Sequence, residues 1–302
     1  MFRKIVKFYN KDRESFFDRL YTRLYGIALQ NFLLKKILSV FKIHDEPEDW
    51  IIILSNYNSG STLLRNILSS ANEIAYFPDE SVLYTKTIKR PDEEFGWQRN
   101  WVYCEDQLKL EDSDKLRFNK YLKDVMPAII SKRTSKFVLE KSISNITRIG
   151  WFEKQCKSVK FIAIVRDPIA SCEGMSRKSH PVGEARIKYG QDSYKTKDLA
   201  LQYKISNEEI LRMQSQVRNM KIIKYEELCE DPNKILNQLF HYLELDNVQL
   251  KIDDKKLEIN GFTFEFKNMN SKSYKNLTNT QIEEIEMINK SLIKKLGYEK
   301  IK

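Results

Sequence analysis

The chain of 302 residues is 41% hydrophobic and carries a formal charge of +10 at pH 7. This composition excludes a disordered chain, and no apolar run approaches the ~20 residues that a membrane-spanning helix needs. The excess of Lys and Arg favours an anionic partner, such as a nucleotide, an acidic substrate, nucleic acid or an anionic lipid surface.

Cysteine and histidine are sparse. Cys104, Cys156, Cys172 and Cys229 are scattered without a Cys-x-x-Cys pair, and the chain has three His. This pattern predicts neither a disulfide framework nor a metal site, and it is typical of a reducing compartment. Because no signal-peptide pattern or spanning segment is recognised, we expect a cytoplasmic protein that either stays in solution or lies peripherally on a membrane.

Residues 1–48 are predicted to form a basic, amphipathic helical arm ahead of the main domain. Residues 1–43 contain ten Lys or Arg and three Asp or Glu, and Phe16, Leu20, Leu24 and Ala28 recur at spacings of four. Two interpretations compete. The arm packs its apolar stripe against its own domain, as such helices usually do, or it lies on an anionic membrane surface.

Residues 50–70 carry the most informative local pattern. Residues 50–54 are apolar and rich in β-branched side chains, as in a buried strand of a parallel sheet. Small polar residues follow at 55–62, and apolar residues then recur at helical spacing. A strand, a tight turn and a helix direct backbone N–H groups and the positive end of the helix dipole at one spot, which predicts a bound phosphate-type anion. The same pattern also forms without any ligand.

The remaining elements alternate between strands and helices. Further strands are predicted at residues 74–77, 137–139, 159–165 and 221–224, and helices at 124–132, 149–155, 170–177, 197–216, from 231 and from 278. Residues 85–120 are predicted to form an irregular aromatic insertion that covers a site. The alternation predicts an α/β fold over residues 49–302, a three-layer parallel sheet flanked by helices, with the helical arm as an addition.

Polar turns follow four of the predicted strands, at residues 58–62, 140–142, 166–168 and 225–227. In such a sheet, ligands bind at the carboxyl ends of the strands, so we expect these turns to meet at one edge. Together they provide backbone N–H groups, a Lys, an Arg and a Tyr. This set of groups suits a nucleotide with more than one phosphate.

With these motifs in order, the chain resembles the sulfotransferases that use 3′-phosphoadenosine 5′-phosphosulfate (PAPS), which have a P-loop-like α/β fold. The turn Asn58-Ser59-Gly60-Ser61-Thr62 is similar to their 5′-phosphosulfate loop, and it is not a Walker A loop because it has one Gly and no Lys. Arg166-Asp167-Pro168 is similar to their 3′-phosphate motif, and Met175-Ser176-Arg177-Lys178 extends this match toward the tyrosylprotein branch. In overall motif style the chain is closest to the tyrosylprotein and carbohydrate branches. The resemblance covers residues 50–298.

The resemblance implies transfer of a sulfuryl group from PAPS to a hydroxyl of a carbohydrate or of a polypeptide tyrosine. It assigns Glu80 as the base that takes the acceptor proton and Lys141 as the group that stabilises the leaving oxygen. The residues that it places around the cofactor are Asn58, Ser59, Gly60, Ser61, Thr62, Leu63, Arg166, Gly174, Arg177, Lys178, Tyr225, Ser271 and Lys272. It implies no metal.

Two residues depart from the family pattern. Asn58 stands where the family usually has Arg or Lys, and Gly174 stands where a Ser usually contacts the 3′-phosphate. These departures keep a non-catalytic nucleotide- or anion-binding protein open as an alternative. A P-loop kinase is a weaker one, because the Walker Lys is missing. The positive charge would also suit nucleic acid, but no binding motif for it is present, so no nucleic-acid partner is expected.

Overall fold

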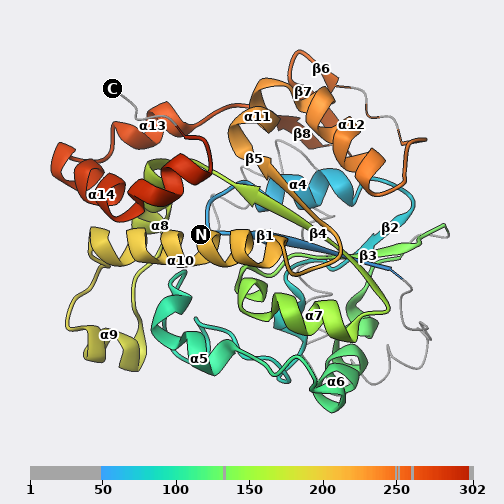
Figure 1. Cartoon of the computed structure of the whole chain (residues 1–302), viewed down its shortest axis with the longest axis horizontal. Helices are drawn as coiled ribbons and strands as arrows, with labels where there is room; N and C mark the ends of the chain where they lie inside the picture. The colour runs from blue at the N-terminus through green and yellow to red at the C-terminus, as the bar shows by residue number, and fades with distance from the viewer. Residues whose placement is uncertain (1–48, 132–133, 249, 251, 260–261, 299–302) are drawn as a thin grey trace, which may run out of the picture.

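The computed structural model describes residues 49–131, 134–248, 250, 252–259 and 262–298, and the predicted arm at 1–48 lies outside these ranges. Five parallel strands form the central sheet. Their order is β2 (Ile74–Tyr76), β3 (Phe137–Glu140), β1 (Asp49–Ser55), β4 (Ser158–Val165) and β5 (Met220–Lys224) (Figure 1). This arrangement confirms the predicted α/β architecture.

Strand β1 lies in the middle of the sheet and is buried on both sides. Trp50, Ile52 and Leu54 point into one apolar core, whereas Ile51 and Ile53 point into a second core on the opposite face. Side chains alternate between the faces of a strand, so a strand covered on both sides needs a continuous apolar run. This requirement explains why the run at 50–54 was recognisable.

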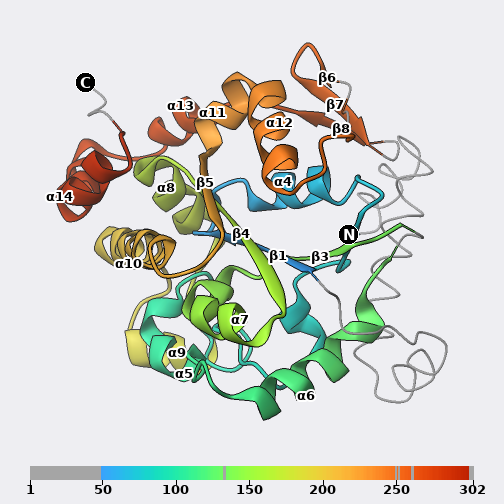
Figure 2. The same ribbon diagram turned by 45° about the vertical axis from the view of Figure 1, so that its right-hand side comes forward.

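Helices cover both faces of the sheet. The first face carries α4 (Ser61–Leu68), α11 (Tyr225–Glu230) and α12 (Pro232–Tyr242), and Figure 2 shows α4 and α12 there. The second face carries α6 (Lys115–Val125), α7 (Ile149–Gln155), α8 (Pro168–Lys178), α10 (Thr196–Gln214) and α14 (Asn279–Lys295). Of the helices in the described ranges, none combines the length and the apolar character needed to cross a membrane.

Smaller elements complete the fold. An antiparallel sheet of β6 (Ile252–Asp253), β7 (Lys256–Ile259) and β8 (Phe262–Glu265) extends the first face. Three short helices are α5 (Glu105–Leu108), α9 (Gly183–Tyr189) and α13 (Asn270–Tyr274). The 3₁₀ helices in the described residues are η1 (Ser81–Tyr84), η2 (Trp101–Cys104), η3 (Met126–Ala128) and η4 (Ile143–Arg148).

Several helices begin at residues whose side chains accept a hydrogen bond from the first turn. Asp167 accepts from the backbone N–H of Ala170 at 2.8 Å, and Pro168 follows as the first residue of α8. Thr278 and Gln281 form a reciprocal capping box at α14. These side chains satisfy backbone donors that a helix cannot pair internally, which makes such starts readable from sequence.

One predicted helix was wrong. The helix expected at residues 124–132 is α6, which begins nine residues before the predicted start, at Lys115, and ends at Val125. Phe118, Tyr121, Leu122 and Val125 form its buried stripe, and Asp114 accepts from the N–H of Arg117. Pro127 prevents continuation of the α-helix, because its ring blocks the preceding turn. The segment expected to be irregular at 85–120 therefore contains η2, α5 and the start of α6.

Candidate active site

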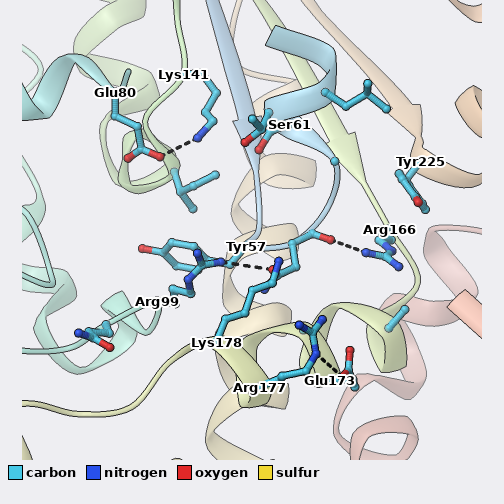
Figure 3. A pocket seen from close by; sticks show the side chains of 18 of the residues that line it. Tyr57, Ser61, Glu80, Arg99, Lys141, Arg166, Glu173, Arg177, Lys178 and Tyr225 are labelled. Atoms are coloured by element: carbon cyan, nitrogen blue, oxygen red, sulfur yellow. Dashed lines mark hydrogen bonds and ion pairs between the residues drawn. The ribbon is translucent and has the colours of Figure 1, made fainter. Parts of the chain in front are cut away.

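A cavity of about 970 Å³ lies where the carboxyl ends of β1, β3, β4 and β5 meet (Figure 3). Its lining contains most of the residues that the sequence singled out: Asn58, Gly60, Ser61, Thr62, Leu63, Glu80, Lys141, Arg166, Gly174, Arg177, Lys178, Tyr225 and Lys272. Ser59 is buried and Ser271 is exposed, and neither is among the residues that line this cavity. Ser273 and Asn276 contribute instead from the region after β8.

The loop between β1 and α4 brings backbone close to the cavity. Asn58 has φ +62° and Gly60 has φ +92°, both in the left-handed region. A Cβ on Gly60 would lie 2.8 Å from Cδ2 of Tyr225, so the close approach itself requires glycine. Helix α4 begins at Ser61 without a side-chain cap, which leaves the N–H groups of its first turn available to an anion.

Glu80 and Lys141 meet at the same cavity although they are far apart in sequence. Lys141 Nζ lies 2.7 Å from Glu80 Oε1, and their side chains are 8% and 28% exposed (Figure 3). Lys141 directly follows β3, whereas Glu80 immediately precedes η1. The pair therefore places a carboxylate and an ammonium at one spot, with the carboxylate still accessible from the cavity.

Beneath this pair lies Glu140, the last residue of β3, to which the sequence assigned no role. Its carboxylate accepts hydrogen bonds from the N–H of Ser81 at 3.1 Å, from Asn145 Nδ2 at 3.0 Å and from the hydroxyl of Ser142. Burial raises the pKa of Glu140 to about 7, although the hydrogen bonds from Ser142 and Ser81 oppose the shift. Glu140 thus anchors the start of η1 next to Glu80. The sequence signal that could have identified Glu140 is a carboxylate residue at the end of an otherwise apolar strand.

Arg166 follows β4 and is held by neutral groups. Its Nη1 donates to the carbonyl oxygen of Asn58 at 2.7 Å, and its Nε donates to Asn270 Oδ1 at 2.9 Å. Its guanidinium lies 4.4 Å from the ring centroid of Tyr225. Nη2 is buried and has no acceptor in the described part of the chain. A buried guanidinium with a free donor and no carboxylate partner is suited to a phosphate.

The last turn of α8 adds two further cations. Arg177 Nε lies 2.8 Å from Glu173 Oε1, so its charge is largely offset. Burial, followed by the positive charges of Arg99, Arg177 and Arg166, lowers the pKa of Lys178. An anion bound among these groups would relieve the repulsion.

The two residues that depart from the family pattern are in contact with each other. A Cβ added to Gly174 would lie 2.9 Å from both Cβ and Cγ of Asn58. Asn58 therefore occupies the space that a longer residue at position 174 would need. Its Nδ2 is buried without an acceptor in the described ranges, whereas its Oδ1 accepts from Arg99 Nη1 at 3.3 Å.

These features fit an anionic nucleotide. Arg166 Nη2 and Asn58 Nδ2 are buried donors without a protein acceptor in the described residues, and the uncapped start of α4 borders the same cavity. The arrangement can position phosphate groups beside the Glu80–Lys141 pair. Among the described residues, no group of three or more His, Cys, Asp or Glu is arranged to hold a metal ion.

A sequence model described as "Sulfotransferase family" matches residues 49–249. A comparison with curated protein sequences gives no match.

Among solved structures, the sulfotransferase domain from the curacin biosynthetic pathway has a TM-score of 0.50 and 17% identity over 84% of this chain and 99% of that chain. The sulfotransferase domain of the Synechococcus PCC 7002 olefin synthase has 22% identity and a TM-score of 0.42 over 68% and 76% of the two chains. Mouse sulfotransferase SULT7A1, solved with 3′-phosphoadenosine 5′-phosphate (PAP), has 14% identity and a TM-score of 0.44 over 86% and 88%.

Proposed function

The chain belongs to the sulfotransferase family, and from this membership we propose that it transfers a sulfuryl group from PAPS to a hydroxyl of a carbohydrate or of a polypeptide tyrosine. The observation that carries the proposal is the Glu80–Lys141 pair, 2.7 Å apart, in the same cavity as Arg166 and the start of α4. One end of this cavity suits phosphates, and the other presents a carboxylate and an ammonium to a reacting hydroxyl.

The chemistry asks for positioning and for charge stabilisation. When bound, PAPS supplies the sulfuryl group and leaves as PAP, while the acceptor oxygen forms the new bond to sulfur. Arg166 and the N–H groups at the start of α4 bind and orient phosphate oxygens. Lys141 Nζ donates a hydrogen bond to the oxygen on which negative charge develops. Glu80 takes the proton that the acceptor hydroxyl releases.

The lining near Glu80 supports an acceptor that combines a ring with hydroxyl groups. Val82, Leu83 and Ile143 provide apolar surface, whereas Asp92 and Gln98 provide hydrogen-bonding groups in the same cavity. Sugars and tyrosine both present a flat or ring-shaped face together with a reactive hydroxyl. We therefore propose these two acceptor classes.

The proposal is tested in two steps. Calorimetric titration with PAP, beside ATP and AMP, should give tight binding of PAP alone, and Arg166→Ala should abolish it. Transfer of labelled sulfate from PAPS is then measured against a panel of sugars and tyrosine peptides. Glu80→Gln should lower the rate by about 10²-fold or more while PAP still binds, because only the proton acceptor is lost.

Glu209→Gln is the matched control. Glu209 has the same 28% side-chain exposure as Glu80 and also pairs with a cation, Arg212, but it lies on α10 outside the cavity lining. Its variant should transfer sulfate normally. Absence of PAP binding by the unaltered protein would overturn the proposed function. Binding without transfer to any acceptor would leave a nucleotide-binding protein, and normal transfer by Glu80→Gln would overturn the role of Glu80.

A further inference from the structure

Arg99 reaches the nucleotide end of the cavity from a segment outside the four polar turns. It lies in the loop before η2, lines the cavity, and donates from Nη1 to Asn58 Oδ1 at 3.3 Å (Figure 3). Nothing in the family motifs pointed to this position. Its guanidinium nevertheless lies beside the loop residue at which the family usually carries a cation.

The backbone holds Arg99 in an unfavourable conformation. Arg99 has φ +53°, which costs a residue with a Cβ about 1–3 kcal/mol. Buried Trp97 supports this conformation from two positions before, since it bridges to Pro181 and stacks on Tyr103 at 4.4 Å. The N–H of Asn100 also donates to the carbonyl oxygen of Trp97 at 3.3 Å. The loop is therefore built to direct the side chain at this site.

The charge of Arg99 is not offset by a carboxylate in the part of the chain that the structure describes. Neither Arg99 nor Lys178 has an ion-pair partner within the described ranges, whereas Arg177 pairs with Glu173. Arg99 is the strongest of the positive neighbours that lower the pKa of Lys178. Two cations without an ion-pair partner among the described residues are directed into one cavity, where a bound anion would offset their charge.

We propose that Arg99 binds the 5′-phosphosulfate group of the donor and supplies the positive charge that Asn58 does not. The inference rests on the proposed function and assigns a residue to it. Asn58 explains why the charge comes from elsewhere. Its backbone is in the left-handed region, and its short side chain packs against Gly174 and accepts a hydrogen bond from Arg99. Arg99 thus reaches the group that a long cationic side chain at position 58 would otherwise meet.

The test compares Arg99→Ala and Arg99→Lys with the unaltered protein by calorimetric titration with PAP. We expect Arg99→Ala to weaken PAP binding by about tenfold to a hundredfold, the range expected for losing a hydrogen bond to a charged group. Arg99→Lys should lose less affinity for PAP than Arg99→Ala, because the lysine keeps the positive charge. Arg212→Ala is the control, since Arg212 is an Arg of α10 that pairs with Glu209 outside the cavity lining.

AMP and adenosine 3′-monophosphate are expected to bind more weakly than PAP, and their displacement of PAP at high concentration identifies the group that Arg99 contacts. Arg99→Ala should weaken the binding of AMP, which carries a 5′-phosphate, and leave the binding of adenosine 3′-monophosphate unchanged. Equal binding of PAP by the variant and the unaltered protein, with unchanged melting temperatures, would overturn the inference and leave the proposed function intact. If Arg99→Ala weakens the binding of adenosine 3′-monophosphate alone, the assignment of Arg99 to the 5′ end is overturned. If the unaltered protein binds no PAP, the proposed function fails first.

Discussion

Because Asn58 and Gly174 are in contact, we expect the residue at position 58 to decide whether Gly174→Ala stabilises or destabilises the protein. Gly174 lies inside α8, where Ala is normally favoured over Gly by about 1 kcal/mol. A Cβ at this position would lie 2.9 Å from two carbon atoms of Asn58, and overpacking of this kind costs about 1–3 kcal/mol. We therefore expect Gly174→Ala to reduce the free energy of unfolding by about 1 kcal/mol.

Removing the Asn58 side chain should reverse this effect. Asn58→Gly suits φ +62° and deletes both contacting carbon atoms, so Gly174→Ala in that background should stabilise the protein by about 1 kcal/mol. The coupling energy between the two positions is then about 2 kcal/mol. Urea unfolding of the four proteins measures it, and each kcal/mol corresponds to about 2 °C in melting temperature.

A helical glycine without this constraint provides the control. In α7, a Cβ at Gly150 would meet the carboxylate of Asp112, which is exposed and can move away. Gly150→Ala should therefore stabilise the protein whether position 58 is Asn or Gly. If Gly174→Ala changes the free energy of unfolding equally in both backgrounds, the contact does not couple these positions and the reasoning is refuted.

Three further predictions concern the rest of the site. Because burial raises the pKa of Glu140 from 4.5 to about 7, its stabilising contribution is full below pH 4.5 and is lost as the pH rises through 7. Between pH 5 and 8, the free energy of unfolding of the unaltered protein should fall by up to about 3 kcal/mol relative to that of Glu140→Gln. If urea titrations show the same pH dependence for both proteins, the prediction is contradicted. Gly60→Ala should destabilise the protein by about 1–3 kcal/mol more than Gly190→Ala. Gly190 shares the positive φ (+74°), but no atom of the described residues lies within 4 Å of a Cβ added there, so equal losses in urea unfolding would disprove the Tyr225 contact. Lys141→Met should lower the rate of sulfate transfer by about 10²-fold or more while PAP affinity changes less than tenfold, and a loss of affinity alone would assign Lys141 to binding.

Local sequence patterns predicted most of the central sheet and much of the site. The apolar run at 50–54 and the runs that became β3 and β4 were recognisable because strands buried on both faces need continuous apolar residues. Pro168 and Thr278 marked helix starts that the structure confirms. The rule that ligands bind at the carboxyl ends of parallel strands then placed Lys141, Arg166 and Tyr225 at one cavity.

Where local signals competed, the sequence was a weaker guide. The helix at 124–132 was misplaced because Pro127 ends α6, while the buried stripe that begins at Phe118 lies within an aromatic and charged stretch with no clear boundary. Glu140 received no role, because burial rather than residue type makes its carboxylate unusual, and burial is a property of the packed molecule.

The sequence by itself predicted four of the parallel strands together with β2, most of the longer helices, the polar segments that follow four of these strands, and the family to which the chain belongs. Only the tertiary structure showed that Asn58 and Gly174 touch, that Glu80 pairs with Lys141, and that Arg99 enters the site. The physical reason is that these contacts join segments separated by 41 to 116 positions along the chain. Spacing along the chain predicts which side chains share one helix or strand, but the packing of distant segments decides which charges face each other across a cavity.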